Sequence, residues 1–301
     1  VKDFVENEVT YFTDLYNRLK KLADEYHEDF PHVRYNGLTQ MDSQFLLTLS
    51  VCERDDRKEE EKIRKIASHL DRLYVLLHLN KAYDSNTFAD SIYDIRTRLE
   101  DSRLAEYEKI FNDSLYDQIE ESRDVRLDEP LPYRFFREIG YEDLNQRFLR
   151  YFFMRVEEYI ADGIGKNLSD SRYNFVRNSG SKNGYHIEHI LANNEDNIRI
   201  FNGEEEEFER ERHRLGALLL LNNRDNLSSG NEIFEKKKDT YATTLYWNQS
   251  LREDFTKSKP NHRDFLNRNN LDLSVGQKFD KRALEQRTRA LYQIAKDTWI
   301  N

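Results

Sequence analysis

Apolar residues recur at three- and four-residue spacing through the first half of the chain, and this period places side chains along one face of an α-helix. Pro130 and Pro132 interrupt the pattern, because two prolines within three residues stop a helix. We therefore expect a helical bundle or layered helical array over residues 1–177, with aromatic stripes that form its core. The stripes are Phe4, Val5, Val9, Phe12, Leu15, Tyr16, Leu19, Leu22 and Ala23; Ile63, Ile66, Leu70, Leu73, Tyr74 and Leu77; Phe88, Ile92, Ile95 and Leu99; Leu104, Tyr107, Phe111 and Leu115; and Leu144, Phe148, Phe152, Val156, Tyr159 and Ile160.

The pattern changes at residues 178–184, a polar stretch with two glycines that is typical of a linker. The local order beyond it, strand, loop, strand and helix, indicates a second domain over residues 178–301. An amphipathic helix that Asp280 caps closes this domain. We expect strands over 185–191 and 215–222, a long acidic loop over 193–214, a turn over 226–230, a helix over 231–241 and a final helix that carries Leu284, Leu291, Ile294 and Trp299.

The composition is that of a folded, highly charged protein. Charged residues make up 35% of the chain and hydrophobic residues 38%, but 18 Phe and 18 Tyr residues in regular stripes argue against disorder. No apolar run reaches the roughly 18 residues that span a bilayer, and no basic, apolar leader opens the chain. The single cysteine, Cys52, excludes an internal disulfide and fits the cytoplasm. Because the chain begins at Val1 inside a helical pattern, we expect a piece of a longer protein or a processed chain.

The charge is distributed unevenly along the sequence. A net charge of -10 argues against strong overall attraction to nucleic acid, because a phosphate backbone is held by clustered Lys and Arg. Residues 226–301, however, contain 14 Lys and Arg against 10 Asp and Glu. The sequence therefore predicts a local basic surface near the C-terminal end.

The stretch Tyr-His-Ile-Glu-His-Ile-Leu at residues 185–191 places two imidazoles and a carboxylate within four positions. Side chains alternate along a strand, so His186 and Glu188 share one face while His189 lies on the other. Where the strand ends, the pleat breaks and Glu188 can meet His189. A carboxylate beside an imidazole offers an oxygen ligand for a divalent metal next to a base that titrates near neutrality.

A wider set of residues accompanies this stretch. Leu215-Gly-Ala-Leu-Leu-Leu-Leu follows about 25 residues later, and Asn226, Asn231, Phe234, Lys237 and Tyr241 come after it. Together they resemble the HNH (His-Me finger, ββα-metal) nuclease domain at the C-terminus of GmrSD-type modification-dependent restriction enzymes, including SspE-like phosphorothioate-sensing nickases. Family members carry an N-terminal NTPase half with an Asp-Gly-Gln-Gln-Arg motif, which this sequence lacks. The sequence departs from the family pattern at Ala192, where a proline is usual, and at Ala217, where an asparagine is usual.

The resemblance implies a metal-dependent DNA endonuclease or nickase, the effector part of a prokaryotic anti-phage restriction system that senses phosphorothioate or modified bases. It implies Mg²⁺ or Mn²⁺ as cofactor, and DNA and a missing NTPase or sensor half as partners. A double-strand cut would need a homodimer or two successive events. A general base takes a proton from the attacking water, and a metal ion stabilises the leaving oxygen. The roles that the resemblance implies are general base for His189, metal ligand for Glu188, and second ligand and catalytic residue for Asn226. From the residues themselves we expect His186 and Asn231 to be accessory residues. Lys236, Lys237 and Lys238 either contact DNA phosphates or form a solvated helix face.

Two other interpretations stay open. A zinc site can be drawn from His186, Glu188, His189 and His213, although their spacing fits no standard zinc motif. Outside that interpretation we expect His213 at the surface. The second alternative is a non-catalytic helical interaction or DNA-binding module with a degenerate HNH unit, which Ala192 and Ala217 support.

Overall fold

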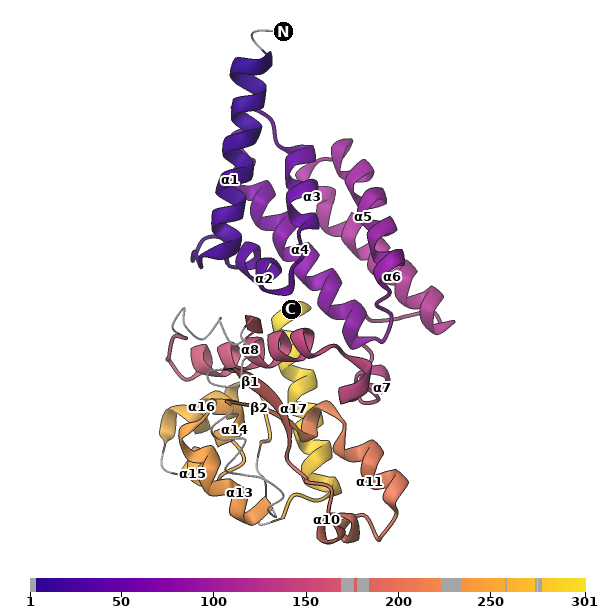
Figure 1. Cartoon of the computed structure of the whole chain (residues 1–301), viewed down its shortest axis with the longest axis vertical. Coiled ribbons are helices and arrows are strands. Elements are labelled where there is room, and N and C mark those ends of the chain that lie inside the picture. The colour runs from indigo at the N-terminus through magenta and orange to yellow at the C-terminus, as the bar shows by residue number, and fades with distance from the viewer. Residues whose placement is uncertain are drawn as a thin grey trace. The chain divides into compact units, whose positions relative to one another are not determined.

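The computed structural model describes residues 4–168, 176–177, 184–222, 234–257, 259–273, 275 and 278–301. These residues are mainly helical with two short strands, which confirms the predicted mainly α class (Figure 1). The chain divides into two compact units, Val1–Pro132 and Tyr133–Asn301, so the break predicted at the two prolines coincides with this division. The predicted boundary after residue 177, between connector and nuclease, stays a prediction. Within the described ranges, no helix has both the length and the apolar character that a membrane span needs.

Helix α4 is the centre of the first unit. It packs against α2, α3 and α6, and α5 packs against α3 and α6. Residues 73–77 of α4 are all buried, as expected for a helix surrounded by others. The elements of this unit are a π-helical segment Phe4–Val9, α1 Thr10–Asp24, α2 Pro31–Thr39, α3 Ser43–Val51, α4 Glu59–Leu79, α5 Ser85–Glu100, a 3₁₀ turn Leu104–Glu106 and α6 Tyr107–Arg123.

The predicted stripes of this unit fall on α1, α4, α5 and α6, and on α5 all four stripe residues are buried. Helix α1 is different, because its stripe is only partly covered among the side chains that the structure describes. Leu15 and Leu19 are buried, whereas Val9, Phe12 and Tyr16 are 45%, 36% and 39% exposed. The core of the unit therefore begins about halfway along α1.

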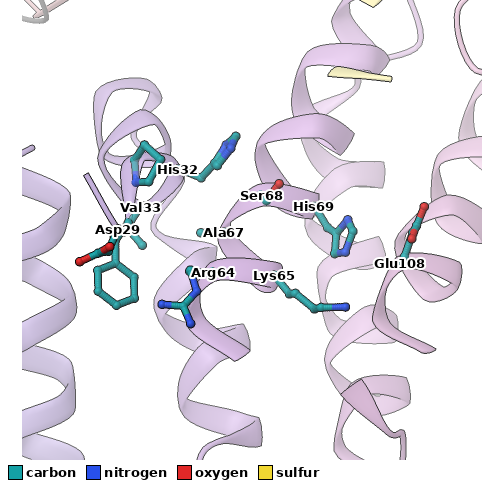
Figure 2. A pocket seen from close by; sticks show the side chains of 11 residues that line it. Asp29, His32, Val33, Arg64, Lys65, Ala67, Ser68, His69 and Glu108 are labelled. Carbon is teal, nitrogen blue, oxygen red and sulfur yellow. The ribbon is translucent and has the colours of Figure 1, made fainter. Parts of the chain in front are cut away.

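A hollow of about 390 Å³ opens in this unit beside the start of α2, one face of α4 and the start of α6 (Figure 2). Phe30 and Val33 contribute to its apolar lining. Figure 2 shows Lys65 and His69 extending from α4 on the side of Glu108 of α6. Burial lowers the pKa of His69 to about 4, although the Glu108 carboxylate acts in the opposite direction.

A second imidazole on α4 is enclosed more completely. The His78 ring stacks on Tyr83 with 4.0 Å between the ring centroids, and its Nδ1 atom pairs with the carbonyl oxygen of Tyr74 at 2.9 Å. The residue is 4% exposed, and burial lowers its pKa to about 4. Both histidines are therefore neutral in the folded chain at pH 7.

The second unit is built around an antiparallel pair of strands, β1 Tyr185–His189 and β2 Leu218–Asn222. The pairing register joins Tyr185 to Asn222 and His189 to Leu218. Both strands lie close to their predicted positions, but each is shorter than expected. The helices of this unit are α7 Tyr133–Phe136, α8 Gln146–Gly163, α10 Glu195–Ile200, α11 Glu205–Arg212, α13 Phe234–Thr240, α14 Tyr246–Gln249, α15 Asp254–Lys257, α16 Pro260–Arg268 and α17 Lys281–Trp299, with 3₁₀ turns at Tyr141–Asp143, Leu215–Ala217 and Tyr241–Thr243.

The long loop predicted over 193–214 is wrong, because this segment contains α10 and α11. Helix α11 has three glutamates in its first turn and Arg210 and Arg212 in its last turn. This distribution of charge matches the helix dipole and stabilises a short helix of low apolar content. The predicted cap of the last helix is confirmed, since the Asp280 side chain accepts a hydrogen bond from the backbone N–H of Ala283.

Helix α14 covers the edge of β2 that faces away from β1. Trp247 Nε1 donates to the carbonyl oxygen of Leu218 at 3.2 Å, and Asn248 Nδ2 donates to that of Leu220 at 3.0 Å. The buried Glu157 carboxylate of α8 accepts two backbone N–H groups at the start of α14. Strand β2 is therefore held on both sides, by β1 and by the side chains of α14.

Gly216, just before β2, lies against α17. A Cβ atom at this position would be 2.4 Å from Thr288 Oγ1 and 2.8 Å from the Thr288 backbone nitrogen, so a larger residue forces the two segments apart. Arg287 of α17 is fully buried beside it and lies 3.7 Å from the ring centroid of Trp247. The glycine of the Leu-Gly-Ala-Leu stretch is thus required by packing.

We expect the free energy of unfolding to fall when the pH is lowered from 7 to 5. The folded-state pKa of His69 and His78 lies near 4, below the ordinary value of 6.5. Between these values the unfolded chain binds more protons, so stability is lost as the pH falls. Urea denaturation of wild type and His78→Phe at both pH values measures the effect. The variant should lose less stability than wild type by roughly 1–2 kcal/mol; equal losses in the two proteins would contradict the burial of a neutral His78.

Candidate functional site

The last two residues of β1 are the carboxylate and the imidazole that the sequence predicts to act together. Opposed residues of an antiparallel pair share a face, so Glu188 lies on the face of Leu219 and His189 on the face of Leu218. The strand ends at His189. Glu188 and His189 therefore alternate across the sheet at the point where the regular pleat ends.

Lys237 of α13 reaches back to this strand end. Its Nζ atom donates to Glu188 Oε1 at 2.9 Å and to the carbonyl oxygen of His189 at 3.2 Å. The Lys237 side chain is fully buried, while that of Glu188 is 20% exposed. The interaction fixes the helix that follows β2 against the end of β1, and it places a cation on one oxygen of the carboxylate.

The three lysines predicted to contact DNA phosphates occupy different positions. Lys236 is exposed, and the Lys238 Nζ atom lies 4.7 Å from the ring centroid of Phe234. Lys237 is the buried partner of Glu188, so its amine faces a carboxylate and not the solvent. A DNA-binding role for these residues stays a prediction.

His189 is surrounded by rings and positive charges. Its Nε2 atom lies 3.2 Å from His213 Nδ1, and the Tyr141 ring meets it edge-on with 5.3 Å between centroids. Burial, followed by the nearby Arg212, His213 and Lys237, lowers the pKa of His189 to about 3. The imidazole is therefore neutral at physiological pH, which is the form that accepts a proton.

His213 is not the free surface residue that we expected. Its side chain is only 22% exposed, and its Nε2 atom lies 3.2 Å from Glu209 Oε2, an oxygen that also accepts a hydrogen bond from Arg212 Nη1 at 3.1 Å. The sequence did carry a signal, because Glu209 and His213 are four positions apart and would share one face of a helix. The signal was missed because this segment was predicted to be a loop.

The backbone around His213 is anchored as well as its side chain. The backbone N–H of Tyr141 donates to the carbonyl oxygen of His213 at 2.8 Å, and Gly140 forms an isolated β-bridge with Arg214. Tyr141 itself was not singled out from the sequence, since nothing in the local pattern links it to β1. Segments near 140, 189 and 213 are thereby brought together.

The described residues contain no group of three or more His, Cys, Asp and Glu that could hold a metal ion. The zinc alternative built on His186, Glu188, His189 and His213 therefore has no support, and His186 lies on the face opposite to His189. Magnesium needs fewer protein ligands, because it keeps waters and takes phosphate oxygens. The partly exposed Glu188 carboxylate offers one oxygen ligand for such a site, while Lys237 occupies one of its two oxygens.

The remaining predicted residues are described only in part. Asn226 and Asn231 lie outside the described residues. His186 has a buried Nε2 atom that lacks a hydrogen-bond partner in the described part of the chain. Ala217, where the family has asparagine, is fully buried, and its carbonyl oxygen accepts the backbone N–H of Ile190 at 2.9 Å. Position 217 therefore reaches the end of β1 through its backbone.

We expect Lys237→Met to lower the free energy of unfolding by about 2 kcal/mol, because it leaves a largely buried carboxylate without its cation. Replacing both partners, in Glu188→Leu/Lys237→Met, should recover part of that loss, since an apolar pair leaves no unpaired charge. The exposed Lys236→Met is the matched control and should change stability by less than about 0.5 kcal/mol. Urea denaturation measures all four proteins. A single variant at Lys237 as stable as the control would show that the ion pair does not hold α13.

Comparison with known proteins identifies the family of the domain that contains this site. The family model described as "GmrSD restriction endonucleases, C-terminal domain" matches residues 133–294, which include β1, β2 and α13 and span more than half of the chain. No curated protein and no solved structure matched the sequence. The match confirms the resemblance seen in the sequence, and a family of restriction endonucleases implies nuclease activity in general, with DNA as the substrate. The chain belongs to the GmrSD restriction endonucleases, of which it carries the C-terminal domain.

Proposed function

We propose that the chain is a metal-dependent DNA endonuclease or nickase with an HNH, ββα-metal catalytic unit. The observation that carries the proposal is the contact of Lys237 with both Glu188 and His189. It holds the following helix α13 against the end of β1, the strand that pairs with β2, where the carboxylate and the imidazole are consecutive residues. Family membership supplies the reaction class, hydrolysis of a phosphodiester bond.

The proposed reaction requires two contributions from the protein, a proton acceptor and ligands for a divalent metal ion. His189, neutral at physiological pH, accepts a proton from a water molecule, and the water oxygen bonds to phosphorus while the bond from phosphorus to the leaving oxygen breaks. The leaving oxygen takes a proton from solvent. A bound Mg²⁺ or Mn²⁺ supplies positive charge beside the phosphate and the leaving oxygen. Glu188 is the residue proposed to hold it, with Asn226 as a second ligand.

The Lys237 cation has a defined part in this proposal. It neutralises one carboxylate oxygen of Glu188 from the buried side, while the 20% exposure of Glu188 keeps part of the carboxylate accessible. A single carboxylate shared between a lysine and a divalent ion binds the ion weakly.

The wider parts of the proposal follow the family. Lys236 and Lys238 contact flanking phosphates from α13, and His186 and Asn231 support the site. DNA carrying phosphorothioate or modified bases is the proposed target, in a cytoplasmic anti-phage restriction system whose NTPase or sensor half lies elsewhere. A double-strand cut requires a homodimer or two successive nicks.

A non-catalytic role is the second candidate, and two observations favour it. Lys237 already gives Glu188 a cation, and Ala217 replaces the asparagine that is usual in the family. A degenerate unit of this kind would bind DNA or another protein without cutting. The two candidates differ in whether an added metal ion produces cleavage.

We expect wild-type protein to convert supercoiled plasmid to open-circle DNA with Mg²⁺ or Mn²⁺ and to lose this activity with EDTA. His189→Ala and Glu188→Gln should lower the rate by roughly 10²–10⁴-fold, the usual contribution of a general base or an electrostatic group. His78→Phe changes a buried histidine of the first unit and should cleave like wild type. Plain and phosphorothioate-modified plasmids are compared in gel assays.

Equal cleavage by His189→Ala and wild type would remove His189 from the mechanism. Absence of cleavage by wild type on every plasmid with either metal would leave the non-catalytic candidate.

A further inference from the structure

We propose that Glu209 and His213 form a positioning chain that holds His189 in its Nε2–H tautomer, so that Nδ1 is the atom that accepts the proton. The effect of this arrangement on the reaction rate rests on the proposed nuclease function. Neither Glu209 nor His213 is a metal ligand or a general base here. Their action reaches the substrate only through His189.

The positioning chain consists of three side chains that contact one another in the order Glu209, His213, His189. Glu209 Oε2 lies 3.2 Å from His213 Nε2, and His213 Nδ1 lies 3.2 Å from His189 Nε2. The two imidazole planes are nearly perpendicular, at 82°, with 4.7 Å between centroids. His213 therefore uses both of its ring nitrogens, one toward the Glu209 carboxylate and one toward His189. His189 uses only Nε2 in this arrangement, which leaves its Nδ1 atom for another partner.

The proton positions follow from the carboxylate. An ionised carboxylate only accepts hydrogen bonds, so His213 Nε2 carries a proton and donates it to Glu209. In a neutral His213 the Nδ1 atom is then an acceptor, which requires His189 Nε2 to carry a proton. A neutral His189 with a proton on Nε2 has its lone pair on Nδ1. No hydrogen bond to that Nδ1 atom occurs among the described residues.

Further hydrogen bonds hold the residues of the positioning chain in place. Arg212 Nη1 donates to Glu209 Oε2 at 3.1 Å, and Arg212 Nε donates to the carbonyl oxygen of Leu191 at 3.2 Å, just beyond β1. The backbone of His213 is held by Tyr141 at 2.8 Å. Helix α11, the residues just after β1 and the turn at Tyr141 thus each contribute a contact, which fixes the Glu209 carboxylate and the His213 backbone.

The groups that face His189 come from several elements. Lys237 of α13 and Arg212 of α11 are the nearby positive charges, Glu188 is its neighbour on β1, and the edge-on ring of Tyr141 packs against it. None of these four groups hydrogen-bonds to a ring nitrogen of His189, whose ring partner is His213. The tautomer of His189 is therefore set by His213 alone within the described part of the chain.

Nitrogen-15 NMR of the histidine rings tests the chain without any activity. In the free wild-type protein at pH 7.5, the His189 signals, assigned by their loss in His189→Gln, should show a protonated Nε2 and an unprotonated Nδ1. His213→Asn retains an acceptor oxygen near the position of Nδ1 and should keep this pattern, whereas His213→Leu should yield a mixture of tautomers. A wild-type His189 with its proton on Nδ1 overturns the proposal, whether or not the protein cuts DNA.

Plasmid nicking supplies the second readout. His213→Leu should lower kcat by roughly 10–100-fold with little change in KM, a loss of the size seen when the hydrogen-bond partner of a metal-ligating histidine is removed. His213→Asn should recover most of the rate, a recovery that a merely structural role does not predict. Glu209→Leu, at a side chain that is 41% exposed, should show an intermediate loss and serves if the His213 variants unfold.

The two proposals fail separately. Unchanged kcat in both His213→Leu and Glu209→Leu would overturn the positioning role while the nuclease remains. A correct tautomer in a protein that never cleaves DNA would instead overturn the nuclease, and with it the catalytic consequence of the chain.

Discussion

The ion pair between Lys237 and Glu188 is the interaction on which the site depends. Lys237 is fully buried, so its charge is tolerated only because Glu188 and the carbonyl oxygen of His189 receive its hydrogen bonds. The same three-way contact joins the helix after β2 to the end of β1. A short two-stranded sheet is marginal by itself, and this unit gains its rigidity from α13 on one side and from Trp247 and Asn248 of α14 on the other.

That packing also sets the chemistry of the imidazole. Burial and neighbouring positive charge keep His189 neutral, and the contact with His213 restricts which of its nitrogens carries the proton. The carboxylate that precedes it in the chain differs, because it pairs with Lys237 and its side chain is 20% exposed. Two adjacent residues on one strand thus have opposite environments: one is an accessible anion and the other an enclosed neutral base. The proposed metal-assisted hydrolysis assigns one role to each of them.

Much of the fold could be predicted from the sequence, because regular periods report on local structure. The stripes on α4, α5, α6 and α8, both strands and the Asp280 cap lie where spacing and capping chemistry place them. The segment of α10 and α11 was missed, because so few of its residues are apolar that periodicity gives no signal. The exposed positions of Val9, Phe12 and Tyr16 could not be foreseen either, since a stripe does not reveal how far its partner extends.

For the site, the sequence identified Glu188 and His189 but not their surroundings. Lys237 appeared as one of three equivalent lysines, and only its burial distinguishes it from Lys236. His213 and Tyr141 reach His189 across long sequence separations, which no local pattern encodes. The central claim is that Glu188 and His189 form a metal-dependent site. Anomalous diffraction from a crystal soaked in Mn²⁺ tests it most directly: the claim predicts a manganese peak about 2.0–2.2 Å from a Glu188 oxygen, on the side of His189, and a crystal whose only manganese lies elsewhere would contradict it.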